Sequence, residues 1–253
     1  MKRLMGVLTL VLLLTGCATT PGTGNPQDPF EGFNRTMFRF NDAVDEAVLK
    51  PVATGYQKVT PSFVQTGIGN FFGNLGDVWT AANNLLQGKV EEGVSDVMRV
   101  AINTVFGLAG VLDVASEAGL TKHKEDFGQT LAAWGVPPGP YLVLPFLGSS
   151  TVRDTAALPA DIAGDVWLYT DPTRTRNAGT AVRVVDERAV LLGAGNLLDD
   201  VALDKYAFVR DAWLQRRESM IGREASSRPS YYDDLDEEDL MDTMPQKPAA
   251  TGS

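Results

Sequence analysis

The chain holds a single histidine, His123, which is the residue best suited to acid–base chemistry near neutral pH. It lies between two lysines and shortly before Asp126, so a carboxylate is available to orient its ring. Ser149 or Ser150 would supply a nucleophile and complete a hydrolytic set with His123. The alternative interpretation is a solvated loop histidine without a chemical role.

Other residues with catalytic or ligand chemistry are few. The acid pairs Asp199–Asp200 and Asp233–Asp234 occupy adjacent positions, which do not share a helix face, so we expect solvated surface charges. The sequence contains no G-x-S-x-G turn, P-loop or dinucleotide fingerprint. One cysteine and one histidine exclude a disulfide framework, a thiolate metal site and a His-rich zinc site. We therefore expect neither a cofactor nor a metal.

The single cysteine, Cys17, has a different chemistry available to it. Two basic residues precede an apolar run, residues 4–14, which has the length of a secretory signal and is too short to span a bilayer. Leu14-Thr15-Gly16-Cys17 then resembles a bacterial lipobox, in which the cysteine accepts acyl chains. Ala18 is the kind of following residue that such lipoproteins carry when they are sorted to the outer membrane.

The lipobox divides the start of the chain into two segments. Residues 1–16 are predicted to be a lipoprotein signal peptide, and residues 17–27 an acylated N-terminus and tether. Two or more acyl chains on Cys17 would anchor the chain stably, at about 0.8 kcal/mol for each buried CH₂.

The composition is that of a globular protein with an acidic balance. The chain has 253 residues and a net charge of −10, with 44% hydrophobic and 21% charged residues, which suits one domain or two small ones. The negative charge argues against a nucleic-acid partner, which would need a basic face. No apolar run after the signal peptide approaches the ~20 residues of a membrane-spanning helix.

The elements are predicted to be mostly helices. Asp28 and Glu31 around Pro29 form a capping box that begins the first one, and Pro51 ends or kinks it. Its apolar stripe has helical spacing: Phe33, Met37, Phe40, Val44 and Ala47. Aromatic residues here are core by default, and a face turned to lipid is the alternative.

The segment after Thr60–Pro61 is unusually rich in glycine. The glycines are Gly67, Gly69, Gly73 and Gly76. They fit either a loop-rich helical turn or a helix that packs closely through Gly69 and Gly73. A short helix over 77–87 is expected to follow.

The clearest amphipathic helix is predicted over 89–106. Further helical segments are expected at 110–119 as a short turn, at 125–134, from about 151, and at 177–193 and 201–217. The polar run 171–176 carries no recognisable signal. Prolines at 137, 138, 140 and 145 make the apolar segment 137–148 an extended hairpin or loop. Residues 229–253 are acidic and proline-rich, so we expect a disordered tail.

Five segments resemble one known family in the same order along the chain. They are 28–38, 100–115, 125–131, 135–146 and 151–154, of which DPFEGFNRTMF and GVPPGPYLVLPF are the most specific. They resemble the MlaA/VacJ family of outer-membrane lipoproteins, over about residues 28–217. We assign residues 28–228 to this helical domain.

The resemblance implies an all-α fold, a ring-like assembly of amphipathic helices with one Pro/Gly-rich apolar hairpin, anchored by lipid on the periplasmic side of the outer membrane. Its implied function is to remove mislocalised phospholipids from the outer leaflet and pass them to a periplasmic carrier, which maintains lipid asymmetry. A trimeric porin is an implied partner. No covalent chemistry is involved, so we expect no enzyme activity.

Lipid-path residues are expected on the first helix and the hairpin: Phe33, Phe40, Asn41, Tyr141, Leu142, Leu144 and Phe146. Asparagines along the helices are expected to offer polar positions for the headgroup. Two other functions remain possible at this point. One is a structural lipoprotein that braces a porin or the cell wall, and the other is a lipid hydrolase that uses His123.

Overall fold

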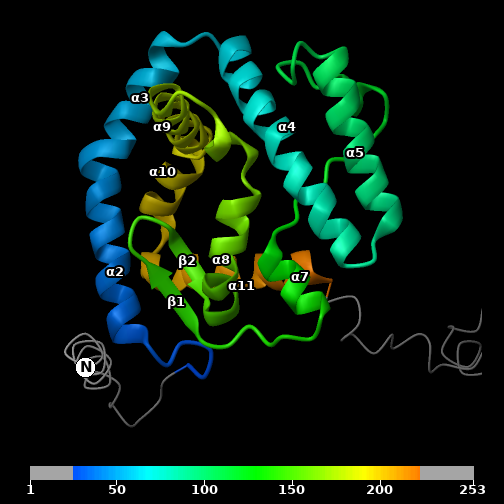
Figure 1. Ribbon diagram of the computed structural model, residues 1–253. Helices are drawn as coiled ribbons and strands as arrows, with labels where there is room; N and C mark the ends of the chain where they lie inside the picture. Colours follow the sequence, from blue (N-terminus) through cyan, green and yellow to red (C-terminus); the bar gives the residue numbers. More distant parts are fainter. Residues whose placement is uncertain (1–24, 223–253) are drawn as a thin grey trace, which may run out of the picture. The chain divides into compact units, whose positions relative to one another are not determined.

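The computed structural model describes residues 25–222 (Figure 1). The signal peptide 1–16, Cys17 and the tail 229–253 lie outside the described residues, as do residues 17–24 of the tether. The chain divides into two compact units, Met1–Asp211 and Ala212–Ser253. Of the second unit the structure describes only residues 212–222, nearly all of them in the last helix.

Helices make up most of the described residues, so the predicted all-α class is confirmed. The long helices are α2 (Glu31–Val44), α3 (Lys50–Val59), α4 (Ser62–Leu86), α5 (Val90–Val105), α8 (Val152–Gly164), α9 (Thr173–Val190), α10 (Leu192–Val201) and α11 (Lys205–Ile221). Shorter helices are η2 (Asp45–Leu49), α6 (Val114–Glu117), α7 (Phe127–Ala133) and η3 (Val166–Tyr169). Strands β1 (Tyr141–Leu144) and β2 (Gly148–Thr151) form an antiparallel pair.

The predicted capping box at Asp28 is wrong. Helix α2 begins at Glu31, and its N-cap residue Phe30 makes no side-chain cap. The Asp28 carboxylate is instead buried, where it accepts hydrogen bonds from Asn34, the Tyr206 hydroxyl and Arg210. Because this carboxylate is bound by Asn34 of α2 and by Tyr206 and Arg210 of the distant helix α11, it is not free to cap the first turn of α2.

Pro51 does not end the first helix, which continues through η2 into α3 as far as Val59. Proline lacks an N–H, and its ring clashes with the carbonyl four residues earlier in a regular α-helix. The π-helical turn η2 immediately precedes α3, so Pro51 lies in the first turn of α3. A missing N–H costs little in a first turn, so the chain remains helical.

The glycine-rich segment belongs to one continuous helix, α4. The prediction of a separate short helix over 77–87 after that segment was therefore wrong. Two of the glycines of α4 make room for side chains from the segment that follows α5. A Cβ on Gly67 would lie 3.0 Å from Val111 Cγ1, and one on Gly73 would lie 3.0 Å from Lys122 Nζ. The close approach is therefore of side chains to a helix and not of two helix backbones.

Helices α4 and α5 pack side by side, joined by a short turn at Gly88, whose φ is +81° (Figure 1). The prediction of a helix over 89–106 is confirmed to within one residue at each end. Helix α7 packs against α8, and the α6 turn lies within the predicted 110–119 segment. Asp126 caps α7 by accepting from the Gln129 N–H at 2.9 Å.

The predicted hairpin is confirmed, with Tyr141 opposite Thr151 and Leu144 opposite Gly148, but only β1 is its apolar strand. The second strand, β2, is polar and extends beyond the predicted segment 137–148 as far as Thr151. Phe146 lies in the turn at φ +64°, a left-handed conformation that a side chain rarely adopts. Thr151 ends β2 and caps α8, because its Oγ1 accepts from the Asp154 N–H at 3.2 Å.

The last helices differ from prediction at their ends. The polar run 171–176 leads into the first turn of α9, which begins at Thr173 and ends at Val190. Helix α10 separates α9 from α11. Helix α11 begins at Lys205, after Asp204 accepts from the Ala207 N–H at 3.1 Å.

Gly164 is expected to be intolerant of any side chain. A Cβ there would lie 2.1 Å from Trp79 Cδ2, and the indole is fixed because its Nε1 donates to Asp161 at 2.8 Å. Gly164→Ala should therefore lower the free energy of unfolding by about 1–3 kcal/mol through overpacking. Gly193→Ala in α10 is the control, since nothing lies within 4 Å of its Cβ position. Equal thermal unfolding of the two variants in detergent would refute this account of Gly164.

Candidate functional site

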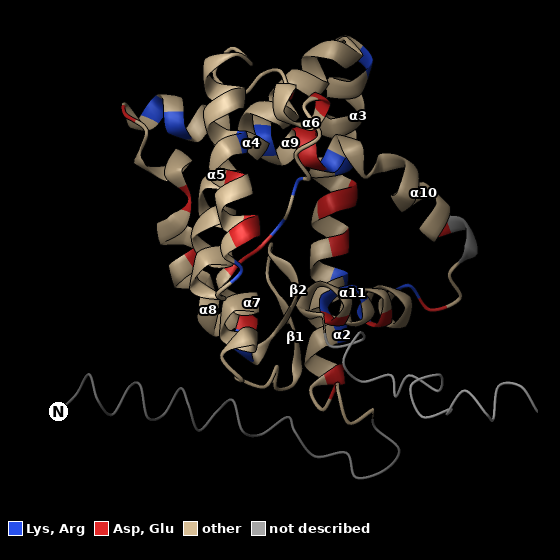
Figure 2. Cartoon of the chain, turned by 90° about the vertical axis from the view of Figure 1, so that its right-hand side faces the viewer, with Lys and Arg blue, Asp and Glu red and all other residues tan. Residues whose placement is uncertain are grey.

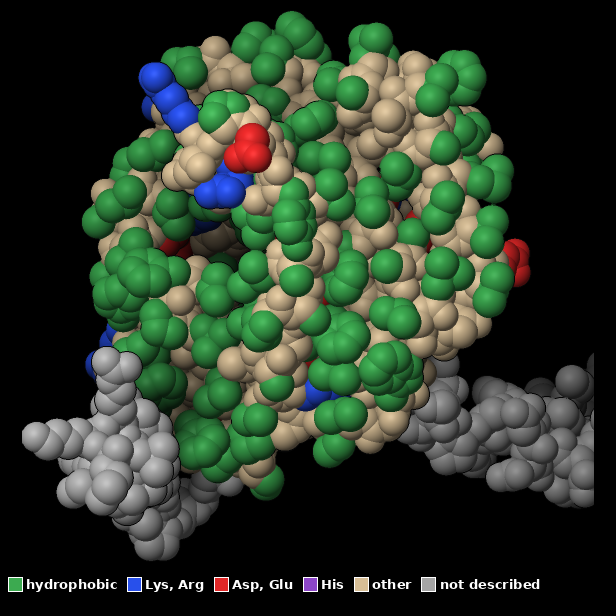
Figure 3. Space-filling view, in the orientation of Figure 1, with side chains coloured by type: hydrophobic (Ala, Val, Ile, Leu, Met, Phe, Trp, Pro, Cys, Tyr) green, Lys and Arg blue, Asp and Glu red, His purple; other side chains and the backbone are tan. Residues whose placement is uncertain are grey.

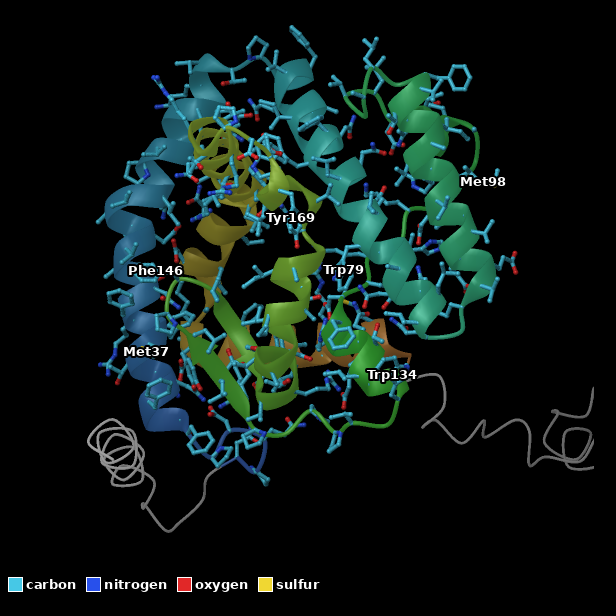
Figure 4. All side chains as sticks on the ribbon, viewed as in Figure 1. Met37, Trp79, Met98, Trp134, Phe146 and Tyr169 are labelled. Carbon is cyan, nitrogen blue, oxygen red and sulfur yellow. The ribbon has the colours of Figure 1, made fainter. Side chains whose placement is uncertain are left out.

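Helix α5 has its polar face inside and its apolar face outside. Its buried residues are Gly93, Asp96, Arg99 and Asn103, at spacings of three and four. The exposed face carries the predicted apolar stripe, including Val94, Val97, Met98 and Val105. Met98 lies on the side of α5 turned away from α4 (Figure 4). The stripe was predicted correctly, but it does not form a core.

Helix α4 shows the same inversion on the side facing α5. It buries Asn74, Asp77, Thr80, Asn83 and Asn84 and exposes Val78, Leu85 and Leu86. Asp77 is its single charged residue, and most of the cartoon in Figure 2 is likewise neither acidic nor basic. We call the layer of polar side chains between α4, α5 and the 113–130 segment the polar seam.

Arg99 is the centre of the polar seam and is fully buried. Its guanidinium donates to both Asp113 oxygens at 3.0 and 3.1 Å, to Ser116 Oγ at 3.1 Å and to the Leu120 carbonyl. Burial alone would raise the pKa of Asp113, but hydrogen bonds from Ser116, Asn103 and Arg99 together lower it well below its usual range. These hydrogen bonds therefore keep the Asp113 carboxylate ionised within the seam.

His123 also belongs to the polar seam. Its Nδ1 lies 2.9 Å from Oδ1 of Asp96, whose other oxygen accepts from Asn84 at 2.7 Å. The expected solvated histidine is therefore wrong, and the acid that orients the ring comes from α5. Ser149 bonds the Tyr141 hydroxyl at 2.8 Å and Ser150 bonds Thr155 at 2.9 Å. The structure does not bring His123 and either serine together as one hydrolytic set.

A cavity of about 430 Å³ lies beside the polar seam and is walled by α4, α8, α9 and residues 122–126. We call it the charged cavity. Its acids are Asp77, Glu125, Asp126, Asp161, Asp165, Asp186 and Glu187, and its bases are Lys122, His123, Lys124 and Arg183. Burial raises the pKa of Asp77, although Lys122 at 3.1 Å opposes the rise. Trp79 lies between α4 and α8 beside this cavity (Figure 4).

A second cavity, of about 470 Å³, lies between α2, the hairpin, α10 and the start of α11. We call it the hairpin cavity. Its walls combine apolar side chains such as Phe38, Leu191 and Phe208 with ion pairs. Arg188 holds Asp45 with two hydrogen bonds of 2.7 Å. Figure 3 shows a face with many hydrophobic and few charged side chains, and with a hollow that contains charged side chains.

Two asparagines of α2 hold the hairpin. Asn34 donates to the Tyr141 carbonyl at 3.0 Å and accepts from the Val143 N–H at 2.8 Å. Asn41, two helical turns later, donates to the Leu144 carbonyl at 2.9 Å and accepts from the Phe146 N–H at 2.8 Å. The two amides thus pair with backbone groups of residues 141–146 in the way that a neighbouring strand would. These two asparagines bind protein backbone, and the expectation of polar positions for a headgroup along the helices stays a prediction.

The predicted lipid-path residues fall into two groups. Tyr141 is fully buried, and Leu142 and Leu144 are half-buried. Phe33, Phe40 and Phe146 are exposed, and Phe146 packs edge-on against Phe40 with ring centroids 5.2 Å apart. Asn41 lines the hairpin cavity, together with Ser149, which the sequence offered as a nucleophile, and with Val143 and Gly148, which it did not single out. Val143 and Ser149 are paired across β1 and β2, and no local sequence signal predicts this register.

Asn41 is expected to hold the hairpin tip in place. Asn41→Leu keeps the approximate volume and leaves the Leu144 carbonyl and the Phe146 N–H without this partner, at a cost of about 1–3 kcal/mol. Hydrogen exchange of residues 141–151 should accelerate in detergent, while α4 and α5 stay protected. Asn70→Leu is the control, because Asn70 bonds the distant Val111 carbonyl. Unchanged exchange in the hairpin would show that Phe40 and Phe146 suffice.

No helix among residues 25–222 is both long and apolar enough to cross a membrane. Helices α4 and α5 nevertheless turn large apolar side chains outward and bury the charged residues Asp77, Asp96 and Arg99. Such an arrangement defines a class of helical protein adapted to apolar surroundings, with polar cavities inside.

The comparison with known proteins identifies the family. Residues 26–220 match the family model described as MlaA lipoprotein, so the chain belongs to the MlaA lipoprotein family. The chain is 37% identical to the intermembrane phospholipid transport system lipoprotein MlaA of Escherichia coli strain K12, over 86% of this chain and 88% of that protein. For the Haemophilus influenzae protein of the same name the identity is 32%, over 92% and 97%.

A solved structure shares the fold. It comes from work on the structural basis for maintenance of bacterial outer membrane lipid asymmetry, and it matches with a TM-score of 0.67 at 35% identity. The match covers 77% of this chain and 98% of the solved one. The family resemblance seen in the sequence is confirmed.

Proposed function

We propose that this chain is an outer-membrane lipoprotein that removes mislocalised phospholipids from the outer leaflet and passes them on for return to the inner membrane. It thereby maintains outer-membrane lipid asymmetry. The observation that carries the proposal is the inverted polarity of α4 and α5, which places a charged cavity within a protein whose outer face is apolar. Membership of the MlaA lipoprotein family supports the same function.

A physical barrier explains why such a protein is needed. Moving a phospholipid out of a bilayer exposes two chains of roughly 15 CH₂ each, at about 0.8 kcal/mol per CH₂, or roughly 24 kcal/mol. Spontaneous escape is therefore very slow. A protein that lies in the membrane and offers the headgroup a polar cavity removes much of that barrier, because the chains can stay in apolar surroundings.

The finer parts of the proposal concern the anchor and the partners. Acylated Cys17 holds the protein to the periplasmic side of the outer membrane, a trimeric porin lies beside it, and a soluble periplasmic carrier accepts the lipid. The predicted residues on α2 and the hairpin border the lipid path. Support for these parts comes from the lipobox and the family resemblance.

The proposed transfer makes and breaks no covalent bond, so the chain acts without enzyme activity. The polar seam gives His123 a structural role through Asp96, which supports this view. In a hydrolase, His123→Ala would abolish release of fatty acids from phospholipid by the purified protein. We expect no such release from the unchanged protein either.

Filling the charged cavity tests the function directly. Gly76 lines that cavity, and nothing lies within 4 Å of its Cβ position, so Gly76→Trp should fold and block the space. A deletion strain that carries this variant should accumulate surface phospholipid as the empty strain does. Gly55→Trp is the matched control, an exposed glycine of α3 with equally open surroundings. A structural brace predicts full complementation by both variants.

A further inference from the structure

An apolar groove of about 430 Å³ runs along α4 opposite part of α9. Phe63, Val64, Ile68 and Phe71 come from α4, and Val182 comes from α9. The remaining lining residues are Phe72, Val111 and the two glycines Gly67 and Gly179. We call it the Phe63 groove. Every side chain that lines it is hydrocarbon, and none belongs to the lipid-path set predicted from the sequence.

Glycine and tryptophan shape this region. A Cβ on Gly179 would lie 2.0 Å from Trp167 Cζ2, so the indole rests directly on the α9 backbone. Its Nε1 donates to the Arg176 carbonyl at 3.1 Å and to Thr180 Oγ1 at 3.2 Å, which fixes the ring. The polar edge of the indole is therefore satisfied within the protein.

Phe72 is the wall that the Phe63 groove shares with the charged cavity, because it lines both. Its ring meets Trp167 edge-on at 5.2 Å and Phe71 edge-on at 5.2 Å. The Arg183 guanidinium of the charged cavity lies 5.9 Å from the same ring. One aromatic side chain thus has a hydrocarbon space and a charged space as its neighbours.

We infer that the Phe63 groove binds one acyl chain of a phospholipid whose headgroup occupies the charged cavity. The inference rests on the proposed function and assigns the chain a place in it. The two spaces differ in polarity as the two parts of a phospholipid do, and they meet at Phe72. Phe63, at the groove, is 76% exposed on the outward apolar surface, from which a chain in a bilayer would enter.

The lining favours a hydrocarbon chain over a peptide segment. A bound peptide strand brings N–H and C=O groups that cost free energy unless they are hydrogen-bonded. The groove offers only apolar side chains and glycine, whereas an acyl chain needs no polar partner. Its volume lies within the range of small-molecule sites, about 300–1,000 Å³.

Val182 and Val184 provide a matched test on one helix. Both are 41% exposed, and only Val182 lines the groove. The purified chain in detergent would be loaded with dioleoylphosphatidylethanolamine and the lipid retained after gel filtration measured. Val182→Trp should retain at least fivefold less than the unchanged protein, and Val184→Trp should match it within twofold. Dihexanoylphosphatidylethanolamine, with chains too short to fill the groove, should bind both variants within twofold of the unchanged protein.

A second variant distinguishes loss of lipid binding from misfolding of Val182→Trp. Phe63→Ser leaves no interior cavity because Phe63 is exposed, and it should also lower retention of the long-chain lipid. Equal retention by the unchanged protein, Val182→Trp and Phe63→Ser would overturn the groove as the chain site and leave the proposed function standing. An equal loss in Val182→Trp and Val184→Trp would overturn it too. Failure of the unchanged protein to retain any phospholipid would instead contradict the proposed function.

Discussion

Replacing Arg99 by Leu should destabilise the protein more than any other single change considered above. The substitution removes the cation from a fully buried site and leaves Asp113 without its bidentate partner. It also removes the cation 3.7 Å from the Asp77 carboxylate. Breaking a buried ion pair by deleting one partner typically costs about 3–5 kcal/mol. Unfolding by guanidinium in detergent measures the loss.

Arg39→Leu is the control for charge removal, since Arg39 is exposed on α2 and donates only to the Arg35 carbonyl among the bonds that the structure describes. Its free energy of unfolding should stay within about 0.5 kcal/mol of that of the unchanged protein. A similar loss in both variants would mean that Arg99 acts through general charge balance. The double variant Arg99→Leu with Asp113→Asn should recover part of the stability, because no unpaired carboxylate remains at Asp113.

The pH dependence of stability offers an independent check. The pKa of Asp113 in the folded protein lies below its usual range. Its contribution to the free energy of unfolding is therefore complete above the unfolded-chain pKa of about 3.9, and it is lost as the pH falls through the folded-state pKa. Arg99→Leu removes one cause of the lowered pKa. The variant should therefore lose less stability on acidification below about pH 4 than the unchanged protein does.

The second large effect is expected on the outer face of α5. Val97 and Met98 are 52% and 48% exposed, and the proposed function places this face in lipid. The double variant Val97→Asp with Met98→Asp would then bring two charges into an apolar environment, at about 2.5–3.5 kcal/mol each near the bilayer centre and less toward its surface. With Cys17→Ala also in place, the chain should leave the membrane fraction upon carbonate washing.

The matched control replaces the same two residues by Leu in the same Cys17→Ala background. Leucine keeps the face apolar, so this variant should behave as Cys17→Ala alone does. If the Asp and Leu variants remain in the membrane fraction equally, the α5 face contacts water or another protein and the placement in lipid is wrong. A normal circular dichroism spectrum of the Asp variant in detergent would establish that the loss is not misfolding.

Much of the fold could be predicted because helical spacing and turn residues are local signals. The helix over 89–106 and the hairpin in 137–148 follow from the pattern of valines and the four prolines. The continuity of the first helix could not be predicted, because a π-helical turn before Pro51 has no local sequence signal. Gly67 and Gly73 read as weak helix residues until the side chains of Val111 and Lys122 are placed against them.

Local sequence patterns could not predict which face of α5 lies inside the protein. An apolar stripe shows that a helix has two faces, but it does not show which face is inside. The buried positions Asp96, Arg99 and Asn103 at spacings of three and four do carry that signal, since polar residues at core spacing require partners elsewhere in the chain. Those partners lie 10 to 27 residues away, at Asp113 and His123, where no periodicity links them.

The candidate site was located only in part for the same reason. Asn41 was singled out beside the hairpin, yet its bonds to the Leu144 carbonyl and the Phe146 N–H join residues 103 to 105 positions apart. The charged cavity draws on α4, α8 and α9, which no motif connects. Such constellations arise from packing, so they become visible only in three dimensions.

The polar seam also has a thermal consequence. In water-soluble domains, the heat capacity rises by about 12–15 cal/mol/K per residue on unfolding, because apolar exposure raises it and polar exposure lowers it. Unfolding this protein would hydrate Asp96, Arg99 and their partners, whereas the valines of α5 already lie outside. Calorimetry in detergent should therefore give a smaller heat-capacity increase per residue on unfolding. The resulting stability curve would be flat, so that cooling weakens the fold far less than it weakens a hydrocarbon core.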